Sequence, residues 1–197
     1  LRHLLALNAT GRNYLHDMLF KYGYIYHHEE HIMDTFECIV TKIDVREFGL
    51  EKISDETKSK ILEAGRMTGT GLNTQHWRFI LVEDGENIKR LAQDSISGNW
   101  AAGANFAVII LTNPVHNFHM IDAGRAAQNM QLAAWNFGVA SGLFTGIREK
   151  EIRRDFNIPK ELNPTIVLGF GDPARKLVGK KNRQPLETLV HREKFRE

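Results

Sequence analysis

Residues 120–137, MIDAGRAAQNMQLAAWNF, repeat apolar side chains in steps of three and four. The repeating positions are Met120, Ala123, Ala127, Met130, Ala134 and Phe137. This spacing predicts one face of a helix, and Gly138 follows it, where a helix is expected to end. The polar residues that lie mostly off this face are Asp122, Arg125, Gln128, Asn129 and Asn136. Because the face is rich in alanine, another backbone can approach it closely. We therefore predict a core helix that also packs against a second subunit, with a core helix in a monomer as the alternative.

The composition is that of an ordinary globular protein, with 197 residues, 42% of them hydrophobic and 25% charged. That length allows one substantial core. No apolar run reaches the ~18 residues of a transmembrane helix, and the net charge of +2 is too small to argue for a nucleic-acid partner. The single cysteine, Cys38, cannot form an internal disulfide. A reducing compartment is thus permitted, and we expect a cytoplasmic protein without a membrane partner.

Basic residues gather near the end of the chain, at Arg175, Lys176, Lys180, Lys181 and Arg183. Charge alone favours a solvated loop, with an anion site as the alternative. Nucleic-acid binding is a further alternative, which would need binding that depends steeply on salt.

The first 32 residues differ from the rest, and we predict an N-terminal extension at 1–32 and a single domain at 33–197. The extension ends in HHEEH at 27–31, one residue short of the H-E-x-x-H spacing of zinc proteases. Metal binding is the alternative there. No further ligand is identifiable, so we predict no metal.

Helices and strands alternate after residue 33. Helices are expected at 33–42, from an N-cap at Ser54 to about Thr68, and at 87–93, 120–137 and 149–156. Strands are expected at 78–83, 105–112, 139–146 and 165–170. The run at 105–112, NFAVIILT, is continuously apolar, which is typical of a central strand. The pattern favours an α/β or α+β sandwich around one central sheet.

The chain has no evident protein nucleophile and no paired carboxylates that would act as acid and base. It lacks G-x-S-x-G. His116 and His119 beside Asp122 are interpreted as a polar cluster at a helix start, with a metal site as the alternative. Scattered polar and basic positions near loop glycines suit an anionic cofactor that performs the chemistry itself.

Four blocks of sequence carry a resemblance to a known family. They are MDTFECIVTKIDVREF at 33–48, GRMTGTGLNTQHWRFILVED at 65–84, IDAGRAAQNMQLAAWNFGVASGLFTG at 121–146, and TIVLGFGDPARK at 165–176 with KKNRQPLETLVH at 180–191. In this order and spacing the chain resembles the nitroreductase family of FMN-dependent oxidoreductases. The first block is similar to the family's Arg-Arg-Ser-x-Arg opening, and the second to its Pro-Ser-x-x-Asn-x-Gln-Pro-Trp segment.

The resemblance implies an α+β three-layer sandwich, with a mostly antiparallel central sheet flanked by helices. It implies a homodimer that shares two FMN sites, with the central helix in its interface. The implied activity is transfer of two electrons from NADH or NADPH, through flavin N5, to a small acceptor such as a nitroaromatic or a quinone. The alternatives are the same fold with other flavin chemistry, dehalogenation or dehydrogenation, and a flavin-binding protein without turnover.

The resemblance also implies cofactor-binding positions. The phosphate side would be contacted by Lys42, Ile43 and Asp44, and the flavin pyrimidine edge by Arg46. The loop that reaches FMN from the other subunit would contain Gly69, Thr70, Gly71, Asn73 and Gln75. Backbone would lie over the flavin at Leu143, Phe144, Thr145 and Gly146, with the Thr145 N–H facing N5. The late basic pair that grips the phosphate would be Lys181 and Arg183. No side chain is expected to be catalytic, because the flavin carries the chemistry.

Several of these positions depart from the family pattern. Asp44 stands where the family has serine, and a carboxylate ~4 Å from a phosphate charge costs roughly 4 kcal/mol at an effective dielectric near 20. We therefore expect Asp44 to turn away, to pair with Lys42 or Arg46, or to weaken FMN binding. His76 replaces a proline, and it is either a substrate-side group or a histidine that packs the loop.

Overall fold

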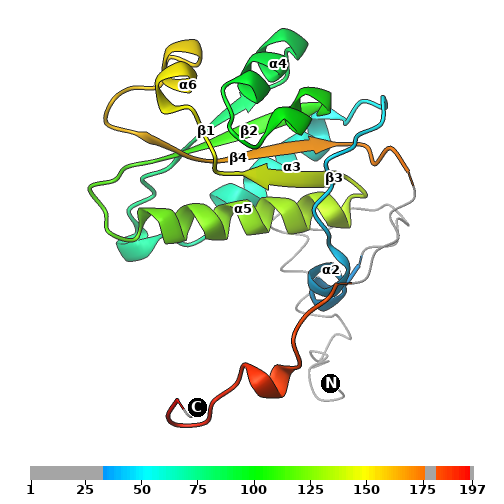
Figure 1. The fold of residues 1–197 in the computed structure, drawn as a ribbon, viewed down its shortest axis with the longest axis vertical. Helices are drawn as coiled ribbons and strands as arrows, with labels where there is room; N and C mark the ends of the chain where they lie inside the picture. Colours follow the sequence, from blue (N-terminus) through cyan, green and yellow to red (C-terminus); the bar gives the residue numbers. More distant parts are fainter. Residues whose placement is uncertain (1–32, 176–180, 196–197) are drawn as a thin grey trace, which may run out of the picture. The chain divides into compact units, whose positions relative to one another are not determined.

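The computed structural model describes residues 33–175 and 181–195 (Figure 1). The chain divides into two compact units, Leu1–Ile32 and Met33–Glu197, and the description below concerns the second. The predicted N-terminal extension and its HHEEH cluster lie outside the described residues.

A four-stranded sheet with the order β1-β2-β4-β3 forms the centre of the second unit. Its strands are β1 (Arg78–Val82), β2 (Phe106–Thr112), β3 (Ala140–Phe144) and β4 (Asn163–Gly171). Every neighbouring pair is antiparallel, which confirms the mostly antiparallel sheet. Every residue of β2 is buried, as its continuous apolar run predicts for a central strand.

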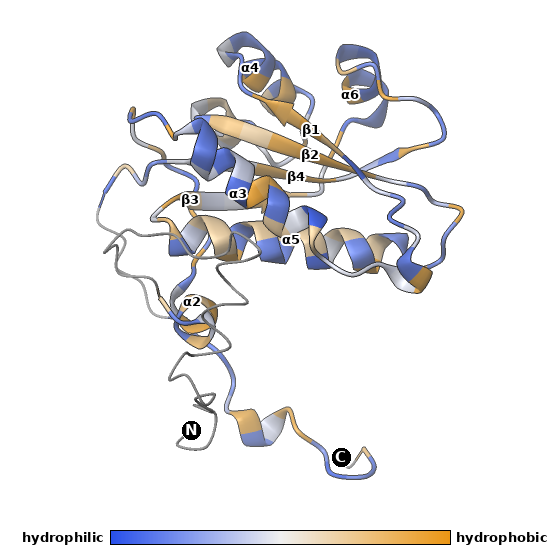
Figure 2. Cartoon of the chain, turned by 180° about the vertical axis from the view of Figure 1, so that it is seen from behind, coloured by the Kyte–Doolittle hydropathy of each residue, from blue (hydrophilic) through white to orange (hydrophobic). Residues whose placement is uncertain are grey.

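Helices cover both faces of this sheet. They are α3 (Asp55–Arg66) and α5 (His119–Asn136) on one face, and α4 (Gly85–Gln93) and α6 (Glu149–Asp155) on the other. The short helix α2 (Thr35–Thr41) packs against α5 instead (Figure 1). Alternate residues of β2 enter two separate cores. Phe106, Val108 and Ile110 pack with α3 and α5, whereas Ala107, Ile109 and Leu111 pack with α4 and α6. The result is the predicted three-layer α+β sandwich, with hydrophobic strands between helices of mixed character (Figure 2).

Local capping accounts for where the helices begin. The Ser54 side chain accepts from the Thr57 N–H, so α3 begins where its predicted N-cap places it. The helix predicted at Asn87 begins two residues earlier, at Gly85, because Asp84 accepts from the Glu86 and Asn87 N–H groups. In the part of the chain that the structure describes, none of the helices has both the length and the apolar character needed to cross a membrane.

The central helix α5 differs from its prediction in which residues it buries. Five of its apolar residues are 0–3% exposed: Ala123, Ala126, Ala127, Met130 and Ala134. Met120 and Phe137, by contrast, are 55% and 36% exposed. The buried face thus extends from Asp122 to Ala134 and leaves out the two residues predicted at its ends. Asp122 and Gln131 are each 1% exposed, because their side chains hydrogen-bond to other segments. Gly138, with φ of +71°, follows the helix as expected.

Trp100 lies across β3 and β4 next to the segment that follows α2. A Cβ at Gly142 would lie 2.8 Å from the Trp100 ring and 2.6 Å from the Val45 carbonyl oxygen. The Val45 N–H donates to the Ser141 carbonyl (2.8 Å) along the free edge of β3. Gly142 therefore allows residues 42–46 to run close beside that strand.

We expect Gly142→Ala to destabilise the fold by about 1–3 kcal/mol, because the added methyl meets backbone and a large ring. Chemical denaturation measures this directly. Gly103→Ala is the control, since nothing lies within 4 Å of a Cβ there. Equal stabilities of the two variants would contradict the close approach.

Candidate functional site

Basic side chains from distant parts of the chain gather beside α2. Lys42 follows the helix and is 9% exposed, and Lys181 Nζ donates to the Ile39 carbonyl of α2. Burial lowers the pKa of the Lys181 ammonium, and the charges of Arg183 and Lys42 lower it further. The structure thus brings together the three cations that were predicted to grip a phosphate.

Asp44 pairs with Lys42, one of the three outcomes expected for this carboxylate. Its Oδ1 lies 2.5 Å from Lys42 Nζ and accepts from Gln131 Nε2 (3.3 Å). Gln131 also donates to Ser141 Oγ (3.3 Å), so the buried middle of α5 is tied both to Asp44 and to β3. An ammonium has three donors, so Lys42 keeps donors for an anion while it is paired.

Arg46 and the end of β3 both contact Trp100. The Arg46 guanidinium sits 5.8 Å from the centre of the Trp100 ring, and this ring meets Phe144 edge-on at 6.0 Å. Leu143 and Phe144 are the last residues of β3, and Thr145 and Gly146 follow them. The Gly146 carbonyl accepts from the Ile96 N–H (2.7 Å). Ile43, beside Lys42, is half-buried.

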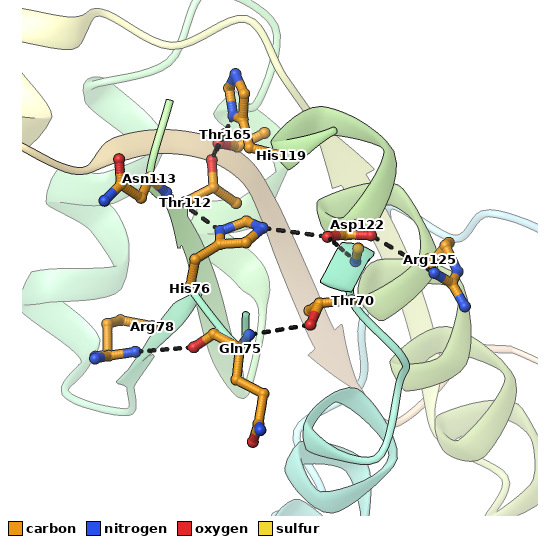
Figure 3. Close-up of polar contacts among 11 residues, drawn as sticks. Thr70, Gln75, His76, Arg78, Thr112, Asn113, His119, Asp122, Arg125 and Thr165 are labelled. Atoms are coloured by element: carbon orange, nitrogen blue, oxygen red, sulfur yellow. Dashed lines mark hydrogen bonds and ion pairs between the residues drawn. The ribbon is translucent and has the colours of Figure 1, made fainter. Parts of the chain in front are cut away.

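The loop after α3 has an unusual backbone. Leu72, Asn73 and Gln75 have φ values of +52°, +53° and +46°, which few residues other than glycine adopt. Each such residue costs of the order of 1–3 kcal/mol, and such strain clusters at functional sites. Thr70 closes the loop with two hydrogen bonds of 3.0 Å. Its carbonyl accepts from the Asn73 N–H, and its Oγ1 accepts from the Gln75 N–H (Figure 3).

This loop and the basic cluster lie at different places along α5. The loop meets α5 at Asp122, which accepts from the Gly71 N–H (3.0 Å), whereas Asp44 meets it at Gln131. Nine residues of helix separate these contacts, or roughly 13 Å at 1.5 Å per residue. The Gly71 part of the loop therefore meets α5 well away from Asp44, the partner of Lys42 in the basic cluster.

A groove of about 520 Å³ opens between the end of α3 and the outer face of α5, beside the loop. Its lining includes Met67, Gly69, Ile121, Gly124 and Arg125. Met67 and Ile121 are 57% and 66% exposed, and a Cβ at Gly124 would meet nothing within 4 Å. The groove thus combines exposed apolar side chains with room for close approach.

The histidines near the start of α5 make hydrogen bonds within the protein. His119 Nδ1 lies 2.9 Å from Thr112 Oγ1, and His76 Nε2 lies 3.2 Å from Asp122 Oδ2. Among the residues that the structure describes, no group of three or more His, Cys, Asp or Glu could hold a metal ion. The side chain of His76 is 2% exposed, which identifies it as a histidine that packs the loop.

Sequence reasoning missed the roles of three residues that organise this region: Asp122, Gln131 and Trp100. It named Asp122 only as part of a polar cluster at the helix start. The sequence does hint at roles for Asp122 and Gln131, because each is a polar residue within an alanine-rich helix. Trp100 carried no local signal, because its role depends on glycines in two strands.

Known proteins resemble this chain in sequence and in structure. The model of the Nitroreductase family matches residues 39–116 and 100–172. A Methanothermobacter thermautotrophicus protein, provisionally named NADH dehydrogenase/NAD(P)H nitroreductase, is 28% identical over 72% of this chain and 78% of its own length. NADPH-flavin oxidoreductase of Vibrio harveyi is 26% identical over 83% of this chain and 75% of its own.

A solved structure, an FMN-dependent nitroreductase from Clostridium difficile, superposes with a TM-score of 0.74. It is 21% identical, and the match covers 80% of this chain and 98% of that one. At this identity the likeness establishes the fold.

We expect sulfate to raise the melting temperature more than chloride does at equal ionic strength, because Lys42, Lys181 and Arg183 are predicted to bind an anion. Each kcal/mol of binding should add roughly 2–4 °C. The gain should shrink as the pH rises, because the lowered pKa lets Lys181 lose its proton before an ordinary lysine does. Sulfate keeps its own charge over this range.

Thermal unfolding followed by circular dichroism makes this measurement. Lys181→Arg should retain the sulfate effect at alkaline pH, and Lys181→Ala should reduce it at every pH. Lys160→Ala, at an exposed lysine elsewhere, is the control. Equal shifts in sulfate and chloride would show that the cluster binds no anion.

Proposed function

The chain belongs to the nitroreductase family, and from this premise we propose that it is an FMN-dependent oxidoreductase that takes two electrons from NADH or NADPH. The relatives named NADPH-flavin oxidoreductase and FMN reductase support this activity. The observation that carries the proposal is the gathering of Lys42, Lys181 and Arg183 beside α2.

The donor set of this cluster fits the phosphate of FMN. That phosphate is close to dianionic, and each charge-assisted hydrogen bond to it contributes about 1.5–3 kcal/mol. Two ammonium groups and one guanidinium supply the donors, and Asp44 offsets part of their charge through Lys42. In this proposal Lys42, Lys181 and Arg183 hold the cofactor by its charged end.

When bound, FMN supplies the hydride chemistry, and the chain supplies orientation and charge. Arg46, resting over Trp100, would place a positive charge at the pyrimidine edge, where it favours the reduced, anionic ring. Residues 143–146 would present backbone to the ring, with the Thr145 N–H toward N5. No protein nucleophile is needed.

We place two copies of the chain around the shared sites. The loop at 69–75 and the basic cluster lie roughly 13 Å apart along α5, so a loop from a second copy would complete the site that one chain leaves open. The groove beside α5 offers that copy a mixed surface, in which the exposed apolar side chains of Ile121 and Met67 lie beside polar ones. Gly124, which has no side chain, leaves room for the backbone of the second copy to approach α5 closely.

The acceptor in this proposal is a small conjugated molecule such as a nitroaromatic or a quinone. Other flavin chemistry on the same fold, dehalogenation or dehydrogenation, is the alternative, as is flavin binding without turnover. Reoxidation of the reduced protein by each class of acceptor separates these possibilities.

The purified protein should be yellow and should release FMN on denaturation. Under argon, NADH or NADPH should bleach the flavin absorbance, and a quinone or nitroaromatic should restore it. Bleaching by neither donor would leave a flavin-binding protein without turnover. A colourless preparation that does not bind added FMN would refute the proposal.

We expect Ile121→Lys to give a monomer with greatly weakened FMN binding, because it replaces an exposed apolar side chain with a charge in the proposed interface that also completes the site. Light scattering on a sizing column gives the mass, and flavin fluorescence gives the affinity. Leu50→Lys, at a side chain that is 99% exposed and lies outside α5, should remain dimeric. A monomeric wild type that binds FMN tightly would contradict the shared site.

A further inference from the structure

A single buried carboxylate holds both ends of the strained loop after α3. Asp122 Oδ2 accepts from the Gly71 N–H at 3.0 Å and lies 3.2 Å from His76 Nε2 (Figure 3). Its side chain is 2% exposed, as is that of His76. Gly71 precedes the three residues with positive φ, and His76 follows them. One oxygen therefore spans the whole strained segment.

The hydrogen bonds around His76 assign its ring proton. The Asn113 N–H donates to His76 Nδ1 (3.3 Å), so Nδ1 is an acceptor and Nε2 carries the hydrogen. Asp122 Oδ2 thus receives two donors, the Gly71 amide and the imidazole N–H. Asp122 Oδ1 faces Arg125 Nη1 at 3.5 Å, and Arg125 also lies beside Gly69.

Packing against aromatic rings further restricts the loop near these hydrogen bonds. A Cβ at Gly71 would lie 2.6 Å from the Phe118 ring, so the backbone sits directly against that side chain. The rings of His116 and Phe118 lie 5.1 and 6.0 Å from the His76 ring, centre to centre. The imidazole is thus held in place by packing on one side and by hydrogen bonds on both nitrogens.

We propose that Asp122 and His76, with the Gly71 amide, form a clamp that sets the conformation in which residues 71–75 meet the cofactor. Both side chains are positioning residues in this role. The inference rests on the proposed function, because it assigns the loop to the flavin site of a second copy. It adds a chemical reason for a histidine at position 76, where the resemblance implies proline.

The clamp makes specific chemical demands at both positions. Asparagine at 122 offers one acceptor oxygen, so it can accept in place of Oδ2 only if its amide group replaces the oxygen that faces Arg125. In that arrangement the asparagine amide N–H would face the Arg125 guanidinium N–H, and the negative charge at position 122 would be lost. At position 76, glutamine can still donate to Asp122, whereas asparagine is too short to reach it and can replace only the Nδ1 acceptor.

The first measurement does not depend on flavin. Amide hydrogen exchange in the cofactor-free protein follows the peptide that covers residues 69–76. Asp122→Asn and His76→Asn should each speed its exchange at least about tenfold, because opening of the loop becomes easier. His76→Gln should restore protection. Thr165→Val, which breaks the contact between Thr112 and Thr165 without touching the loop, controls for a general loss of stability.

The second measurement is the FMN dissociation constant, taken well below the melting temperature of each variant. Asp122→Asn and His76→Asn should weaken FMN binding about tenfold or more, which corresponds to the loss of one hydrogen bond to a charged group. His76→Gln should bind within a few-fold of wild type, as should Thr165→Val. The visible circular dichroism of bound flavin should change in the first two variants.

The two measurements separate the possible failures. Unchanged exchange in Asp122→Asn would overturn the clamp, whatever the flavin does. Faster exchange with unchanged FMN affinity would show that the clamp holds the loop but does not serve the cofactor, which overturns the proposal. A wild type that binds no FMN would refute the proposed function and, with it, the positioning role, while the exchange data would still decide whether the clamp exists.

Discussion

The burial of α5 against one face of the sheet determines where the candidate site can form. Four of its five alanines and Met130 lie in the core, and a Cβ at Gly65 of α3 would lie 2.1 Å from Met130 Cε, so the helices pack closely. A polar side chain inside such a core is costly unless it is hydrogen-bonded. Asp122 and Gln131 meet this requirement in different directions, the first with the 69–75 loop and the second with Asp44 and β3.

The basic cluster and the 69–75 loop therefore have different physical characters. Around Lys42, positive charges crowd together, and the lowered pKa of Lys181 reflects that crowding as well as burial. An anion would relieve this crowding of positive charge, which is why the basic cluster is proposed to bind a phosphate. The buried carboxylate of Asp122, by contrast, is met by the Gly71 amide, the His76 imidazole and Arg125. These contacts stabilise the strained backbone of the 69–75 loop.

Local patterns predicted most of the secondary structure, because periodicity, caps and turn glycines act over a few residues. The Ser54 cap, the β2 run and the Gly138 stop all lie where they were expected. The predicted apolar face of α5 was wrong at its ends, because the exposure of Met120 and Phe137 depends on how far the neighbouring layers extend. The cofactor-binding residues came from resemblance alone, and their roles remain predictions.

The sequence by itself determined the order of helices and strands and the alanine face of α5, because these follow from spacing within short segments. Local spacing left α/β and α+β open, and the resemblance to a family implied α+β. Only the tertiary structure decided that Asp44 pairs with Lys42 while also meeting Gln131, and that Asp122 joins Gly71 to His76. Contacts such as that between Asp122 and Gly71 link residues 51 positions apart. No local pattern encodes them, because the packing of α5 against the sheet and the loop sets those distances.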